Sequence, residues 1–225
     1  RDLNSLILQH AEDYELSQNG MINDGIIATK LGLQGIPEMA EIIIIERDLA
    51  LLENINCRYH ISQLSSAKSV EIIKSKKENI KFSCGVSINN LSLNEHDIGD
   101  FRTFLKLSPP LRTEEDRISL VKGLSDGTID VIVSDHKPED EEQKRLTFAK
   151  AATGSSGVET LLSLSKFIDE ERPYFAYDKQ YQQQEIDRLA SPDDESSTEL
   201  GEVPHSSQKG SITRDTHGRY TPGYR

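Results

Sequence analysis

The chain has 225 residues, of which 35% are hydrophobic, and it carries a formal net charge of −12 at pH 7. Nucleic acids and anionic membranes are polyanions, so this charge argues against both as partners. The mean hydropathy of −0.54 is low for a fully globular chain of this length, so either the core is thin or part of the chain does not fold.

Segments typical of strands and of helices alternate up to residue 168. Strand-like apolar runs occupy 5–10, 57–62, 80–87 and 129–135, and helical patterns occupy 36–55, 66–79, 113–127 and 157–168. Helix-end signals support these assignments: Pro37 suits a first turn, Ser66 and Thr113 suit helix starts, and Gly127 suits a helix end. Strands that alternate with helices and are continuously apolar predict a parallel sheet flanked by helices.

About four strand–helix units are visible, whereas a complete (β/α)₈ barrel needs eight units and typically about 250 residues. The sequence therefore predicts an α/β fold, a partial TIM barrel over residues 1–170. The remainder, 171–225, contains stretches such as "SPDDESSTE" without a sustained period, and we predict that it is a disordered tail. The chain begins with Arg1 rather than Met, which we interpret as a fragment or a processed product.

The cysteines and the lack of long apolar runs bear on the compartment. Cys57 and Cys84 have no CxxC spacing and lie in apolar contexts, which is typical of buried thiols in a reducing compartment. There is no run of 18 apolar residues and no visible signal peptide. We expect a cytoplasmic protein with no membrane partner.

Polar, metal-competent side chains follow three of the predicted strands where each strand ends. The first strand is followed by His10, Glu12 and Asp13, the second ends with His60 and Gln63, and the last is followed by Asp135 and His136. Ligands of barrels and open α/β sheets bind at the carboxyl ends of the strands, and imidazole and carboxylate groups suit a divalent metal such as zinc. A single histidine at a strand end is more often structural, so the spacing alone leaves a metal site and ordinary strand ends both open.

The order of several sequence blocks adds a family resemblance. In chain order these are "HAED", "LGLQGIPEMAE", "ERDLALL", "YHISQLSS", "LSPPLR", "EDRISLVKGLSDGTIDVIVSDHKPED" and "GSSGVETLLSLS". Over roughly residues 7–166 the chain resembles the C-terminal half of the barrel of class I dihydroorotases, in the amidohydrolase superfamily. The resemblance stops near Phe167.

The resemblance implies a distorted TIM barrel of the metal-dependent hydrolase type, with one or two divalent metal ions, usually zinc. The family reaction is the reversible hydrolysis of dihydroorotate to carbamoyl-aspartate in pyrimidine biosynthesis, by a metal-activated water. Asp135 matches the catalytic aspartate that also binds metal, and His10 matches a metal-ligand histidine. His60 is expected to be a further ligand or a neighbour of the ligands.

Several positions depart from the family pattern. Gln63 stands where a ligand histidine is expected, and an amide oxygen is a poorer zinc ligand than imidazole. Ser108 replaces a substrate-contacting asparagine. Glu139 replaces a substrate-binding histidine, and its negative charge should repel an anionic substrate. Gly154 is a further candidate substrate-binding position, and the family's first-strand ligands are not in this chain.

These observations support three hypotheses. The first is a dihydroorotase-like cyclic amidohydrolase that acts on a small molecule; its full-length parent would be a homo-oligomer, and the isolated chain would be inactive. The second is a non-catalytic scaffold that associates with aspartate transcarbamoylase. The third is a truncated gene product joined to unrelated sequence after residue 167.

Overall fold

The computed structural model describes residues 5–55, 57–170, 213–214 and 220–221. The chain divides into two compact units, Arg1–Tyr181 and Gln182–Arg225. In the second unit the described residues are two short antiparallel strands, β7 (Thr213–Arg214) and β8 (Tyr220–Thr221). The rest of the predicted disordered tail lies outside the described residues, so the disorder and the domain boundary at residue 170 stay predictions.

Four parallel strands form the centre of the first unit. They are β1 (Leu6–Gln9), β4 (Arg58–Leu64), β5 (Ser83–Ser87) and β6 (Val131–Val133), and they lie in the order β1-β4-β5-β6. Each corresponds to one of the predicted strands. The prediction of an α/β fold with a parallel sheet is confirmed.

The alternation of side chains gives this sheet two different faces. Ile7 pairs with Tyr59, and Leu8 pairs with His60, so the members of each pair share a face. Tyr59 and Ile61 are buried against the helices, whereas His60 is on the opposite face, where Leu8 is 65% exposed. In a (β/α)₈ barrel that opposite face points into the barrel.

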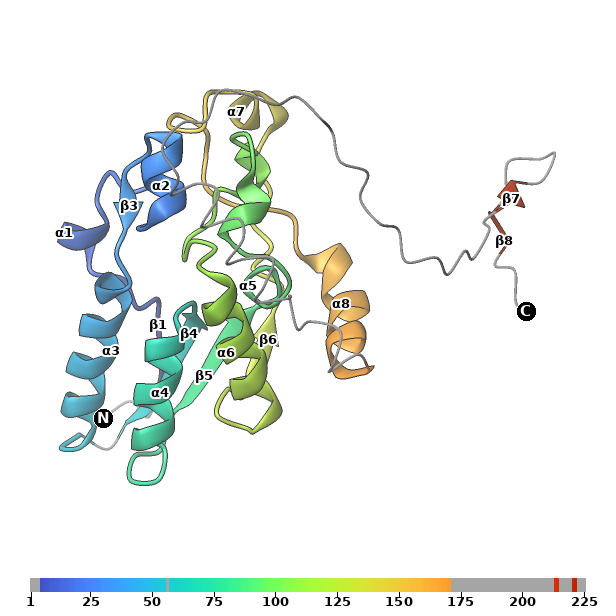
Figure 1. Ribbon diagram of the computed structural model, residues 1–225. Helices are drawn as coiled ribbons and strands as arrows, with labels where there is room; N and C mark the ends of the chain where they lie inside the picture. Colours follow the sequence, from blue (N-terminus) through green and yellow to red (C-terminus); the bar gives the residue numbers. More distant parts are fainter. Residues whose placement is uncertain (1–4, 56, 171–212, 215–219, 222–225) are drawn as a thin grey trace, which may run out of the picture. The chain divides into compact units, whose positions relative to one another are not determined.

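Three helices cover the face of the sheet that carries Tyr59 and Ile61. Figure 1 shows α3 (Met39–Leu52), α4 (Ala67–Lys76) and α6 (Glu114–Ser125) side by side in front of the strands. The side chain of Ser66 accepts a hydrogen bond from the Ser69 amide at the start of α4, as predicted from its position. Thr113 begins α6 through a reciprocal capping box with Asp116, so this prediction is also confirmed.

The main core lies between these helices and the sheet. Ile45 and Leu49 of α3 and Ile61 of β4 are completely buried there. Full burial of one such side chain stabilises the fold by about 1.5–3 kcal/mol. The other members are Ala11, Ile44, Tyr59, Leu64, Val70, Ile73, Ile80, Cys84, Val86, Ile88, Leu91, Leu120 and Ile129.

The predicted helix at 36–55 begins three residues late. Ile36 pairs with Asn23 in a small parallel sheet formed by β2 (Ile22–Asn23) and β3 (Gly35–Ile36), and α3 starts at Met39. Pro37 accordingly precedes the helix instead of occupying its first turn. The residue before a proline is driven toward extended backbone, which favours the strand at Ile36.

Several short elements were not predicted. They are α1 (Tyr14–Ser17), α2 (Ile26–Leu31), α5 (Ile88–Ser92), the 3₁₀ helices η1 (Glu95–Ile98) and η2 (Thr103–Leu105), and α7 (Glu141–Lys144). A second buried cluster holds part of this region together, and it consists of Ile22, Ile27, Ala28, Ile98, Leu107, Leu111 and Phe148. The last helix, α8 (Val158–Glu170), matches the predicted helix at 157–168. None of the helices within the described residues is long and apolar enough to cross a membrane.

Candidate functional site

His10 and Asp135 lie in one cavity, although they follow strands at opposite edges of the sheet. His10 follows β1 and Asp135 follows β6, both at the carboxyl ends of their strands. The cavity has a volume of about 260 Å³, and its walls are His10, Ser108, Asp135, Lys137, Thr153 and Gly154. The cavity thus lies at the carboxyl ends of the strands, where barrels bind their ligands.

The imidazole of His10 takes part in a hydrogen-bonded triangle. Its Nε2 atom is 2.9 Å from Oε2 of Glu12 and 3.2 Å from Oγ of Ser108, and the Ser108 hydroxyl donates to the same Glu12 oxygen at 3.0 Å. The hydrogen bond with Glu12 raises the pKa of His10, and the same bond lowers the pKa of Glu12 to about 2. An imidazolium–carboxylate pair is therefore favoured here, and Glu12, which the sequence placed at the end of the first strand without assigning it a role, is a residue of the site.

Asp135 has an unusual backbone conformation. Its φ is +47°, a region that non-glycine residues seldom adopt but in which aspartate is enriched. The backbone that follows Asp135 is fixed in position. The amide of Lys137 donates to the carbonyl of Ser155 at 2.8 Å, and His136 forms a parallel β-bridge with Ser155. This bridge fixes where the Asp135 carboxylate enters the cavity.

His136 supports this turn rather than lining the His10 cavity. Its Nδ1 atom accepts hydrogen bonds from the amides of Gly157 at 3.3 Å and Val158 at 3.4 Å, at the start of α8. The amides at a helix start have no partner within the helix, and the imidazole satisfies two of them. Its neighbour Asp135 is the acidic residue among the walls of the His10 cavity.

His60 and Gln63 lie in a second cavity, on the inner face of the sheet. This cavity has a volume of about 420 Å³ and also includes Ser62 and Asp135. The register of β4 shifts between Ile61 and Leu64, which allows both Ser62 and Gln63 to face it. The Nδ1 atom of His60 is 2.7 Å from Oγ of Ser83, so its Nε2 atom is the one left for a ligand.

Asp135 is thus shared by both cavities, whereas His10 and His60 are separated. Among the described residues no group of three histidine, cysteine, aspartate or glutamate side chains is arranged to hold a metal ion. In addition, Nε2 of His10 already contacts Glu12 and Ser108. The donors that these residues bring together do not fit a complete metal centre, so the predicted set of His10, His60 and Asp135 stays a prediction.

The predicted substrate positions also separate. Ser108 and Gly154 line the His10 cavity, but Glu139 is not among its walls. Glu139 instead lies near enough to the Lys144 ammonium to affect its pKa. Lys137 and Thr153, which were not among the predicted residues, complete the cavity.

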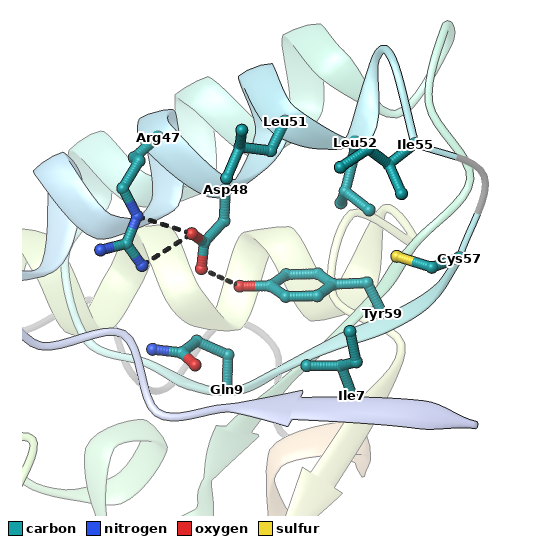
Figure 2. Close-up of a pocket in the computed structure, with 9 residues that line it drawn as sticks. All are labelled: Ile7, Gln9, Arg47, Asp48, Leu51, Leu52, Ile55, Cys57 and Tyr59. Carbon is teal, nitrogen blue, oxygen red and sulfur yellow. Dashed lines mark hydrogen bonds and ion pairs between the residues drawn. The ribbon is translucent and has the colours of Figure 1, made fainter. Parts of the chain in front are cut away.

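A third cavity, of about 270 Å³, lies on the helix side of the sheet (Figure 2). Its polar groups are already paired, because the Tyr59 hydroxyl donates to Asp48, and Asp48 forms an ion pair with Arg47 at 2.7 Å. Burial raises the pKa of Tyr59, so its hydroxyl stays protonated. The cavity lies on the face opposite His60, and we do not assign it to the site.

The sequence is similar to dihydroorotases from several bacteria. The family model described as dihydro-orotase-like matches residues 1–69. The dihydroorotase of Ehrlichia chaffeensis is 47% identical over 165 residues, which are 72% of this chain and 37% of that protein. The dihydroorotase of Desulforapulum autotrophicum is 39% identical over 167 residues, 73% of this chain and 39% of that protein. The chain thus spans less than two-fifths of the length of these relatives.

A solved hydantoinase structure and a solved dihydroorotase structure share the fold of this chain. The L-hydantoinase (dihydropyrimidinase) of Arthrobacter aurescens superimposes with a TM-score of 0.61 at 27% identity, over 72% of this chain and 38% of that one. The dihydroorotase of Saccharomyces cerevisiae, solved with 5-fluoroorotic acid, gives a TM-score of 0.58 at 16% identity, over 84% of this chain and 47% of that one, and supports the fold alone. These neighbours agree with a partial TIM barrel. The matched part of this chain belongs to the dihydroorotase-like amidohydrolases.

Proposed function

We propose that this chain contributes part of the active site of a dihydroorotase-like cyclic amidohydrolase. The observation that carries the proposal is the cavity shared by His10, Ser108, Asp135 and Gly154, at the carboxyl ends of the strands. These are four of the positions that the family resemblance assigned to metal, proton transfer or substrate. The reaction is the reversible hydrolysis of dihydroorotate to carbamoyl-aspartate.

In this proposal Asp135 is the general base. In the hydrolytic direction a water attacks the ring amide carbon, and Asp135 accepts a proton from that water. Asp135 then returns the proton to the ring nitrogen as the carbon–nitrogen bond breaks. A carboxylate that is only half-buried and opens into the cavity suits this role, because it reaches both the water and the substrate.

The relatives belong to a family that is generally metal-dependent, and we propose zinc as the metal of the complete protein. Its centre needs more donors than the described residues bring together. We therefore expect the isolated chain to turn over no substrate. We propose a cytoplasmic location and a homo-oligomeric complete protein.

A chimera tests the proposal. The 165 matched residues of the Ehrlichia chaffeensis dihydroorotase are replaced by their counterparts from this chain, and hydrolysis of dihydroorotate is measured. We expect turnover, and we expect Asp135→Asn to lower kcat by about 10²–10⁴-fold, the usual contribution of a general base. Asp100→Asn, which removes an exposed carboxylate outside the cavity, is the matched control. Equal rates for the two variants would remove Asp135 from the role.

A second candidate is a non-catalytic dihydroorotase-like scaffold for aspartate transcarbamoylase. It is favoured by Gln63, which lines the inner-face cavity with His60 at the position where the family resemblance places a ligand histidine. A folded chimera that binds less than about a tenth of an equivalent of zinc and is inactive would favour this candidate. Co-elution of the full chain with aspartate transcarbamoylase in gel filtration would be the positive result.

A further inference from the structure

One of the residues that line the His10 cavity is the exposed lysine Lys137. None of the described residues forms a hydrogen bond or ion pair with the ammonium of Lys137, whereas His10 is already paired with Glu12. The other walls are the carboxylate of Asp135 and the neutral groups of Ser108, Thr153 and Gly154. Lys137 is therefore the free positive charge with which this cavity can meet an anionic ligand.

The backbone of Lys137 is held in place by the neighbouring segment, while its side chain is exposed. Its backbone amide donates to the carbonyl of Ser155 at 2.8 Å. Gly154 packs directly against it: a Cβ atom built on Gly154 would lie 2.4 Å from the Lys137 carbonyl oxygen and 3.0 Å from its Cγ. The amide of Gly154 is itself tied to the carbonyl of Lys106 at 2.9 Å. A side chain larger than glycine at position 154 would displace Lys137 from the cavity.

The acidic residue that was expected to repel an anionic ligand does not line this cavity. Glu139 is not among the cavity walls, and its charge acts on Lys144, where it opposes the lowering of the Lys144 pKa by burial. A carboxylate ligand in the cavity thus meets the ammonium of Lys137, with Asp135 free to act on another part of the ligand. A cavity of about 260 Å³ admits a single small ring rather than a larger molecule.

We propose that Lys137 is the specificity-determining residue that binds the carboxylate of a small cyclic amide. The proposal rests on the proposed function, because it takes the cyclic amide as the ligand of the same cavity. Its new content is that the choice between a ring that carries a carboxylate and one that lacks it is made by Lys137. A charge-assisted hydrogen bond of this kind is expected to change the dissociation constant by about tenfold or more.

The test measures binding to the full chain of two ligands that differ in one group. L-Dihydroorotate carries the carboxylate, and 5,6-dihydrouracil has the same ring without it. Titrations followed by amide chemical shifts or by calorimetry give both dissociation constants. We expect dihydroorotate to bind about tenfold or more tightly than dihydrouracil. We also expect Lys137→Met to remove this preference and leave the dihydrouracil affinity unchanged, and Lys137→Arg to restore it.

Lys81→Met is the matched control, because it removes the same charge from an exposed lysine just before β5, at the opposite ends of the strands. The preference should survive in this variant. If both ligands bind equally well to the unaltered chain, or if the two methionine variants lose the same amount of affinity, the role of Lys137 is refuted while the proposed function stands. If neither ligand binds to the full chain, the assignment of Lys137 is refuted, whereas the proposed function is decided separately by the turnover of the chimera.

Discussion

The buried side chain of Lys106 gives the sharpest test of how this structure is held together. Lys106 is only 8% exposed, and its ammonium donates to the carbonyl oxygens of Phe148 and Ala149, both at 3.0 Å, and of Ala151 at 2.9 Å. These carbonyls end the segment that leads to cavity residues 153–154. Replacing Lys106 by methionine keeps most of the apolar stem and removes all three donors.

The expected cost follows from the three carbonyls. A buried carbonyl that loses its partner costs about 1–3 kcal/mol, so three give an upper limit of about 9 kcal/mol. Two effects reduce this sum: the variant no longer desolvates an ammonium, and a carbonyl near the surface can regain a water. We expect Lys106→Met to lower the free energy of unfolding by about 3 kcal/mol.

Urea unfolding of the full chain measures this loss. The control is Lys68→Met, since Lys68 is exposed and its ion pair with Glu71 lies at the surface, where such pairs add little stability. The two variants should therefore differ by about 2 kcal/mol or more. Unfolding free energies that agree within about 0.5 kcal/mol would refute the reasoning from buried carbonyls.

The pH dependence of the same pair of proteins gives an independent check. Burial lowers the pKa of Lys106 below its ordinary value of 10.5. Between the lowered folded pKa and the unfolded value, the folded chain binds fewer protons than the unfolded chain, so the unfolding free energy rises with pH across that window. The methionine variant lacks this increase. The stability difference between the unaltered chain and the variant should widen as the pH is raised toward 10.5, and a constant difference would contradict the assignment.

Two further substitutions test other parts of the fold. Arg117→Met leaves the buried carboxylate of Glu114 without the guanidinium that lies 2.5 Å away, so we expect the free energy of unfolding in urea to fall by about 3–5 kcal/mol. The control Arg145→Met, from an exposed ion pair, should lower it by less than about 0.5 kcal/mol. Equal losses in the two variants would contradict the role of the buried pair. Gly157→Ala places a Cβ atom 1.8 Å from the carbonyl oxygen of Ser134, so α8 must shift; we expect a thermal midpoint lower by several degrees, and an unchanged midpoint would show that the packing is looser than described.

Local sequence signals were sufficient for the large elements. Ser66 and Thr113 begin α4 and α6 because a side-chain oxygen near an unpaired helix amide needs no tertiary contact. The order of the four strands in the chain is also their order in the sheet, as expected when helices connect neighbouring parallel strands. The start of α3 was different: Pro37 favours extended backbone at Ile36, but the pairing of Ile36 with Asn23 is a contact that no local pattern contains.

For the candidate site, too, one part of the arrangement was predictable from the sequence and another part was not. The sequence by itself determined that His10, His60 and Asp135 follow or end parallel strands, which places them at one end of a sheet. Only the tertiary structure decided which of them share a cavity, because strand alternation, the register shift in β4 and the turn at Asp135 set the direction of each side chain. It also decided that Lys137, and not Glu139, faces the His10 cavity, since the packing of a glycine against a lysine stem depends on two chain segments that meet only in the folded protein.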